Sequence, residues 1–174
     1  MEIDSKTLNQ PNDSWDVLGY LAPRALRAAL YSLTGGSEVL SIHVDLAYKS
    51  NGPTTWAGAL LLPHALVVAT AVGKSSGDRP WNYRQETSFP LAGNETPRVT
   101  AEHIGFDQIK SVGITALQAW DTDPGCLDTV TEWEVTTTTD PIVFPLVKRD
   151  EAARVPGCDE FVQALLVQMR ESAQ

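Results

Sequence analysis

Residues 40–72, LSIHVDLAYKSNGPTTWAGALLLPHALVVATAV, decide the fold that this sequence predicts. From Leu40 to Ala47 apolar and polar residues alternate, which is typical of a strand with one buried and one exposed face. Asn51-Gly52-Pro53 is a strong turn signal, and Pro63-His64 breaks the apolar run that follows it. We therefore expect an antiparallel meander of three strands, at 40–47, 56–62 and 65–72.

The segment before this meander is expected to be helical. Residues 1–12 are polar with little to bury, and they predict a flexible tail. Ser14 is a suitable N-cap for a short helix through Leu21, and Pro23 fits the first turn of a second helix. The second helix has an apolar stripe and ends at Gly35-Gly36. Residues 13–37 are therefore interpreted as an N-terminal helical segment.

The sequence after the meander predicts more strands and a closing helix. Pro145 cannot donate to a ladder, so the last of these strands is expected at a sheet edge. Asp159 is a good N-cap for a helix with an apolar stripe from Phe161 to Met169. No repeat and no second core-sized segment is found, which predicts a single domain. The strands are expected at 98–104, 109–117, 130–138 and 142–147, with a corner at 106–108.

Composition narrows the function classes. Of 174 residues, 43% are hydrophobic and 20% charged, so the chain has the composition of a globular protein. A formal net charge of -9 disfavours nucleic acid and anionic membranes as partners, because both repel a negative field. No apolar run approaches the roughly 20 residues of a membrane span, and the polar N-terminus does not resemble a signal peptide. Cys126 and Cys158 are the only two cysteines and form no disulfide framework, which predicts a cytoplasmic location. A disulfide between these two residues is the alternative.

The succession of strands and the closing helix carries a resemblance to a known family. A strand meander, the corner Phe106-Asp107-Gln108-Ile109-Lys110-Ser111-Val112, further strands and a C-terminal amphipathic helix together resemble bacterial pleckstrin-homology-like (PH-like) domains. The chain is also similar in layout to small, uncharacterised actinobacterial proteins. The resemblance covers roughly residues 38–172, so residues 38–174 are taken as the PH-like part. It implies an α+β fold, in which a strongly bent antiparallel sheet or partly open barrel of about seven strands is capped by the C-terminal helix, with N-terminal helices added.

The resemblance also implies a function. PH-like domains generally act as binding or assembly modules, and the eukaryotic members hold phosphoinositides with a basic loop between the first two strands. In this chain the corresponding stretch, 48–56, offers only Lys49, so phosphoinositide binding is not inherited. We expect a non-enzymatic module that binds a protein partner or another copy of itself, with no nucleic acid, no membrane and no cofactor.

The long loop at 73–97 is the candidate contact surface. Glycine and proline interrupt all periodicity there, and loops of this length tend to be functional or disordered. Cations and aromatic rings alternate within it, and these side chains are enriched at binding hot spots. The structural alternative is that Trp81 folds back over the sheet while the cations stay solvated. The predicted partner-binding residues are Lys74, Arg79, Trp81, Tyr83 and Arg84.

An enzyme is the alternative hypothesis. The three histidines, His43, His64 and His103, lie in no catalytic motif, and no phosphate-binding glycine loop is complete. Acidic residues gather between Asp121 and Asp128, which suggests a divalent ion in a metal-assisted hydrolase. A calcium loop that starts at Asp121 fits poorly, because Cys126 stands where the turn glycine is needed. The ion would be held by Asp121, Asp123 and Asp128. A third hypothesis is a small apolar ligand in the open end of the sheet, beneath the final helix.

Overall fold

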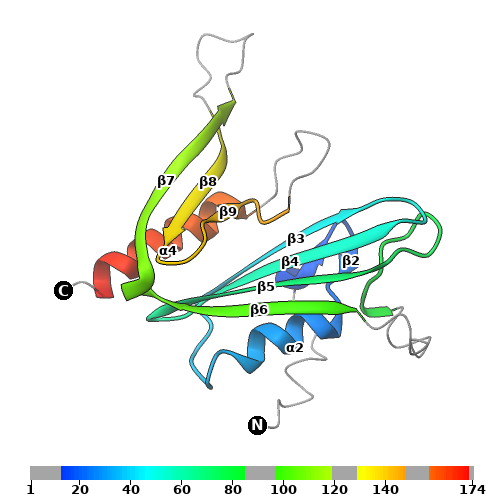
Figure 1. Ribbon diagram of the computed structural model, residues 1–174, viewed down its shortest axis with the longest axis horizontal. Helices are drawn as coiled ribbons and strands as arrows, with labels where there is room; N and C mark the ends of the chain where they lie inside the picture. The colour runs from blue at the N-terminus through cyan, green and yellow to red at the C-terminus, as the bar shows by residue number, and fades with distance from the viewer. Residues whose placement is uncertain (1–12, 85–96, 119–128, 148–156, 173–174) are drawn as a thin grey trace.

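A four-stranded antiparallel sheet occupies the centre of the molecule (Figure 1). The computed structural model describes residues 13–84, 97–118, 129–147 and 157–172. The sheet has the order β3-β4-β5-β6, and its first three strands confirm the predicted meander. Its strands are β3 (Ser41–Tyr48), β4 (Pro53–Leu61), β5 (Ala65–Lys74) and β6 (Arg98–Gly105).

Helix α2 (Arg24–Ser32) covers one face of this sheet (Figure 1). Leu26 and Leu30 are fully buried and pack with the residues of β4 and β5 that point toward the helix. Gly58 permits this close packing, because a Cβ at that position would meet the side chains of both leucines. The predicted helix after Pro23 is therefore confirmed, and its apolar stripe forms the first core together with Trp15, Trp56, Leu60, Val67 and Trp81.

The predicted helix from Ser14 to Leu21 is wrong. The chain instead forms a short 3-10 turn, η1 (Asp13–Trp15), and a hairpin of β1 (Asp16–Val17) and β2 (Tyr20–Leu21). Leu18 and Gly19 both have positive φ, as a two-residue hairpin turn requires, and the Gly19 amide donates to Asp16 Oδ1 over 2.7 Å. Ser14, the predicted N-cap, therefore lies within the 3-10 turn, and Asp16 stabilises the hairpin turn that follows.

A second, three-stranded sheet and the C-terminal helix lie on the other face of the first sheet (Figure 1). The chain passes from β6 through a 3-10 turn, η2 (Phe106–Gln108), at the predicted corner. The C-terminal helix α4 (Cys158–Ser172) confirms the predicted closing helix and buries Phe161, Val162 and Leu165 in a second core. The strands of this sheet are β7 (Ile109–Gln118), β8 (Thr129–Thr137) and β9 (Ile142–Phe144).

The observed class is α+β with antiparallel pairing, as expected. The described residues form nine strands in three sheets, counting the small β1-β2 hairpin. β6 and β7 are consecutive in sequence, yet they belong to different sheets. After the β1-β2 hairpin and α2, the described chain thus forms a four-stranded sheet, a three-stranded sheet and helix α4. Its strands do not form one continuous ladder, so the expected single bent barrel of about seven strands is not seen in the described residues.

Strand β3 differs from its sequence pattern. The alternation at 40–47 predicts one polar, exposed face, but His43 and Asp45 are buried as fully as Val44 and Leu46. Val44 and Leu46 belong to the core beneath α2. His43 instead packs against Phe144 and Phe161, with ring centroids 5.8 Å apart in each case. The strand is thus covered on both faces, because the second sheet and α4 lie over the side that the sequence marks as polar.

Candidate functional site

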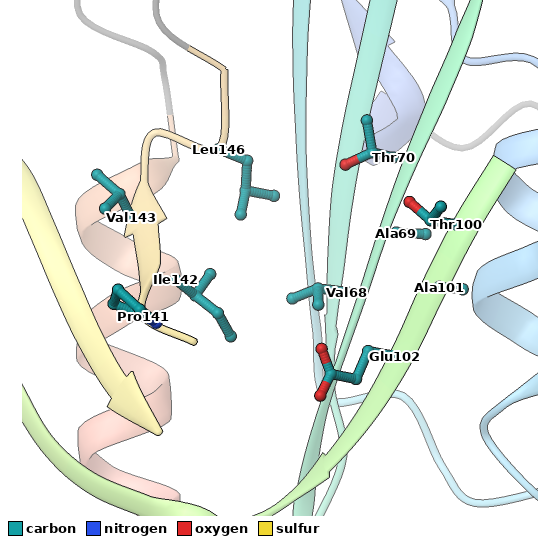
Figure 2. Close-up of a pocket in the computed structure, with 10 residues that line it drawn as sticks. All are labelled: Val68, Ala69, Thr70, Thr100, Ala101, Glu102, Pro141, Ile142, Val143 and Leu146. Carbon is teal, nitrogen blue, oxygen red and sulfur yellow. The ribbon is translucent and has the colours of Figure 1, made fainter. Parts of the chain in front are cut away.

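A cleft of about 430 Å³ lies between the four-stranded sheet and the segment around β9. Figure 2 shows Ile142 and Leu146 on one side of it and Val68 and Thr70 on the other. This volume is within the range of small-molecule pockets. The described residues that line it are Val68, Ala69 and Thr70 of β5, Thr100, Ala101 and Glu102 of β6, and Pro141, Ile142, Val143 and Leu146.

The strand register explains why polar groups meet on this wall. In the β5-β6 ladder Val68 pairs with Glu102, and Thr70 pairs with Thr100. Side chains of directly paired residues lie on the same face of a sheet, and alternate residues share a face. The even-numbered residues of β5 and β6 thus point away from α2 and toward the second sheet. The cleft therefore has one carboxylate and two hydroxyls opposite an apolar wall.

Among the described residues, Glu102 is the only ionisable side chain that lines this cleft. It is exposed, and within the described part of the chain no cation forms an ion pair with it. An aliphatic group with a positive end would match both walls, because its stem would contact Val68 and Ile142 while its charge faced the carboxylate. The cleft is thus suited to a side chain such as that of lysine or arginine.

His43 and Asp45 form a buried pair on β3. Across the paired strands of the sheet, His43 is aligned with Val68 and Glu102, and Asp45 is aligned with Thr70 and Thr100. His43 Nε2 and Asp45 Oδ2 are 3.0 Å apart, and the Leu146 amide donates to the same oxygen over 2.6 Å. Asp45 Oδ1 has no hydrogen-bond partner among the described residues. Since Leu146 also lines the cleft, Asp45 fixes the far wall of the cleft to β3.

This pair does not form an active site in the described structure. A histidine and an aspartate are two members of a nucleophilic triad, but a triad must also reach its substrate. His43 is 2% exposed, Asp45 is 0% exposed, and neither side chain lines the cleft. The contacts of the pair with Leu146, Phe144 and Phe161 favour a structural role. The other two histidines, His64 and His103, are exposed in a turn and on β6.

The edge of β6 is the second component of the site. The Phe106 amide donates to the carbonyl of His64, which is in phase with the β5-β6 ladder. Backbone groups of alternate residues point in opposite directions, so the even-numbered residues of β6 bond to β5. Val99, Ala101 and His103 consequently direct their N–H and C=O groups away from the sheet. Ala101 and His103 are exposed, and among the described residues no strand pairs with this edge of β6 beside the cleft.

Trp81, which the sequence analysis assigns to an exposed binding loop, is buried in the structure. Trp81 is 3% exposed and belongs to the core beneath α2. Its amide donates to Thr54 Oγ1 over 3.0 Å, and its carbonyl accepts from Trp56 Nε1 over 2.6 Å. Its ring packs against Gly73, where any Cβ would overlap the indole. The structural alternative, in which Trp81 folds back over the sheet, describes its position.

The other four loop residues do not join Trp81 in one surface patch. Tyr83 is half-buried, and the Arg27 guanidinium lies over its ring, 4.8 Å from the centroid. Lys74, Arg79 and Arg84 are exposed. Arg27 is itself buried on α2, and the sequence analysis did not single it out. Partner binding by the loop therefore stays a prediction, because the described residues of the loop do not form an exposed aromatic surface.

The proposed metal ligands Asp121, Asp123 and Asp128 lie outside the described residues, as does Cys126. Within the described ranges no group of three or more His, Cys, Asp or Glu side chains is placed to hold a metal ion. Glu132, the last position of the calcium-loop pattern, accepts a hydrogen bond from Thr115 Oγ1 over 2.8 Å. The hydrolase hypothesis is thus not tested by the described structure.

Comparisons with protein-family models, curated proteins and solved structures gave no match for this chain. Among the described helices none is long and apolar enough to cross a membrane. The function is therefore argued from the geometry of the cleft and the β6 edge.

Proposed function

We propose that this chain is a non-enzymatic protein-binding module that receives an extended segment of its partner along β6. The observation that carries the proposal is the open edge of β6 beside a cleft that contains Glu102. Strand addition supplies main-chain hydrogen bonds, and pockets for alternate side chains supply specificity. The outward groups of Val99 and Ala101 would bond to the partner, and Glu102 would select a basic side chain.

The strand order supports the fold that belongs to this proposal. Four antiparallel strands, a corner, three further strands and a C-terminal helix agree with a PH-like domain. In this proposal the two sheets are the two halves of a partly open barrel, and the cleft lies where they separate. A location in the cytoplasm also belongs to the proposal.

Peptide selection against the whole chain tests this function. A random displayed library should enrich peptides with a basic residue, and the enriched sequences should bind as synthetic peptides. Ala101→Pro removes an outward N–H and should abolish their binding, while Glu102→Gln should weaken the binding of basic peptides about tenfold. Glu38→Gln removes an exposed carboxylate elsewhere and is the matched control. Peptides that bind Ala101→Pro as tightly as the parent chain would show that β6 is not the receiving strand.

A further inference from the structure

We infer that the extended segment received by β6 is β6 of a second copy of this chain, paired antiparallel about Thr100. This inference rests on the proposed function and names its partner. The residues Arg98-Val99-Thr100-Ala101-Glu102 have opposite charges at positions equidistant from Thr100. A two-fold axis through Thr100 would therefore place each Arg98 opposite Glu102 of the other copy, as a self-complementary interface requires.

The direction of the backbone groups agrees with this register. With Thr100 on the axis, Val99 lies opposite Ala101 of the second copy, and both residues direct their N–H and C=O groups outward. These residues would exchange backbone hydrogen bonds across the interface. Arg98 and Glu102 would then form non-hydrogen-bonded pairs, in which opposed Cα atoms are only about 4.5 Å apart and the side chains are closest. Opposite charges at such positions stabilise strand pairing.

Other in-phase registers lack this match. With Ala101 on the axis, Arg98 lies opposite Ile104, and Glu102 lies opposite Thr100. With His103 on the axis, Glu102 lies opposite Ile104, and Arg98 has no partner within β6. With Glu102 on the axis, two carboxylates oppose each other, and Arg98 lies opposite Phe106, which is outside β6. The register about Thr100 is the one that pairs both charges of each copy.

The pairing also involves the cleft. Arg98, Thr100 and Glu102 lie on the sheet face that bears the cleft, and Thr100 and Glu102 line it. Arg98 of the second copy would therefore lie over Glu102 at the cleft. Glu102, which has no ion pair among the described residues, would thus face a basic side chain of the type that fits the cleft. The joined sheet would contain eight strands, four from each copy.

The charged residues of β6 have a second interpretation that the experiment must separate. Native proteins place charges at open edges to prevent pairing with arbitrary strands. Charges with that role alone need no symmetry, whereas self-pairing requires opposite signs at positions that exchange under the two-fold axis. A contact of one strand is also short compared with the roughly 20 residues a side of standard interfaces. We therefore expect a weak dimer that forms as the concentration rises.

Charge reversal tests the register. Sedimentation velocity over a concentration series should show a monomer-dimer equilibrium for the parent chain. Arg98→Glu and Glu102→Arg should each weaken dimerisation about tenfold or more, because each variant faces itself with two like-charge pairs. An equimolar mixture of the two variants should associate again, because both pairs of the mixed dimer then have opposite charges. The double variant Arg98→Glu/Glu102→Arg should dimerise like the parent chain.

Matched controls and contrary outcomes complete the design. Arg170→Glu and Glu38→Arg make the same changes of net charge at exposed positions outside β6, and they should leave dimerisation unchanged. Circular dichroism should show the same fold for every variant. A parent chain that stays monomeric at its highest soluble concentration, or single variants whose mixture does not associate, would overturn the inference. If peptides still require Ala101, only the second copy is refuted as partner; if they do not, the proposed function fails as well.

Discussion

The two edge strands of the central sheet, β3 and β6, have opposite environments. The four consecutive residues from His43 to Leu46 are buried, and η1, β1 and α4 contact the strand. In β6, by contrast, the four consecutive residues from Thr100 to His103 are exposed. Both strands have an ionisable residue on the face toward the second sheet, but Asp45 is enclosed with His43, whereas Glu102 opens into the cleft.

This difference shows how one sheet can have a structural edge and an available edge. Unpaired backbone groups at a sheet edge template pairing with another chain unless they are covered. Segments far away in sequence lie against β3: η1 and α4 contact the strand, and the Leu146 amide donates to the Asp45 side chain. In β6 the residues from Thr100 to His103 are exposed, and among the described strands only β5 pairs with it. Pairing through β6 therefore needs no rearrangement of the sheet.

The largest expected effect is at the covered edge. Asp45→Ala leaves the His43 ring and the Leu146 amide without their acceptor in a buried site, which should lower the free energy of unfolding by about 3 kcal/mol. Asp45→Asn retains a side-chain oxygen and should lose less. Denaturant unfolding provides the measurement, with Asp140→Ala as an exposed control. Equal stability of Asp45→Ala and the control would mean that the pair does not fix β3.

Proline substitutions at two neighbouring positions of β6 should have different effects on stability, because the N–H of one residue points toward β5 and the N–H of the next points outward. Thr100→Pro removes an N–H that points to β5 and should lower the free energy of unfolding by about 2 kcal/mol. Ala101→Pro removes an outward N–H and should change stability by less than about 1 kcal/mol, while it abolishes pairing. Thermal unfolding of both variants checks this difference. If Ala101→Pro is the more destabilised, the backbone directions assigned to β6 are reversed.

The smallest effect is expected at Glu102. Glu102→Gln changes an exposed side chain without an ion pair in the described residues, so its stability should stay within about 0.5 kcal/mol of the parent. Binding of basic peptides should nevertheless weaken. Chemical unfolding and peptide titration of the same sample compare the two quantities. A stability loss as large as that of Asp45→Ala would indicate that Glu102 is structural and that the two edges do not differ as described.

The sequence predicted the elements better than the site. Apolar periodicity located β3, β4, β5 and α4 to within a few residues, and Phe106–Gln108 is the predicted corner. It misassigned the segment from Ser14 to Leu21, because the same polar residues that cap helices also form turns. The predicted partner residues are aromatic or basic, but residue type alone does not show whether a side chain is exposed, and Trp81 packs inside the core.

The cleft was not predicted, although part of its signal is visible. Arg98, Thr100 and Glu102 alternate along one strand, which indicates a polar face. The opposite wall comes from Ile142 and Leu146, and no sequence pattern relates these residues to β6. Which strand ends a sheet, and what lies over it, depends on contacts between distant segments.

Local features can be recognised from the amino-acid sequence: the alternation within the strands, the turns at Asn51-Gly52-Pro53 and Pro63-His64, and the amphipathic closing helix. The sequence also determined the charge symmetry of β6 about Thr100, because that symmetry is a property of five consecutive residues. The burial of β3, the lack of a strand beside the outer edge of β6 in the described structure, and the cleft at Glu102 depend instead on the packing of distant segments. The reason is physical, since periodicity follows from the backbone geometry of neighbouring residues, whereas burial follows from which distant surfaces pack together.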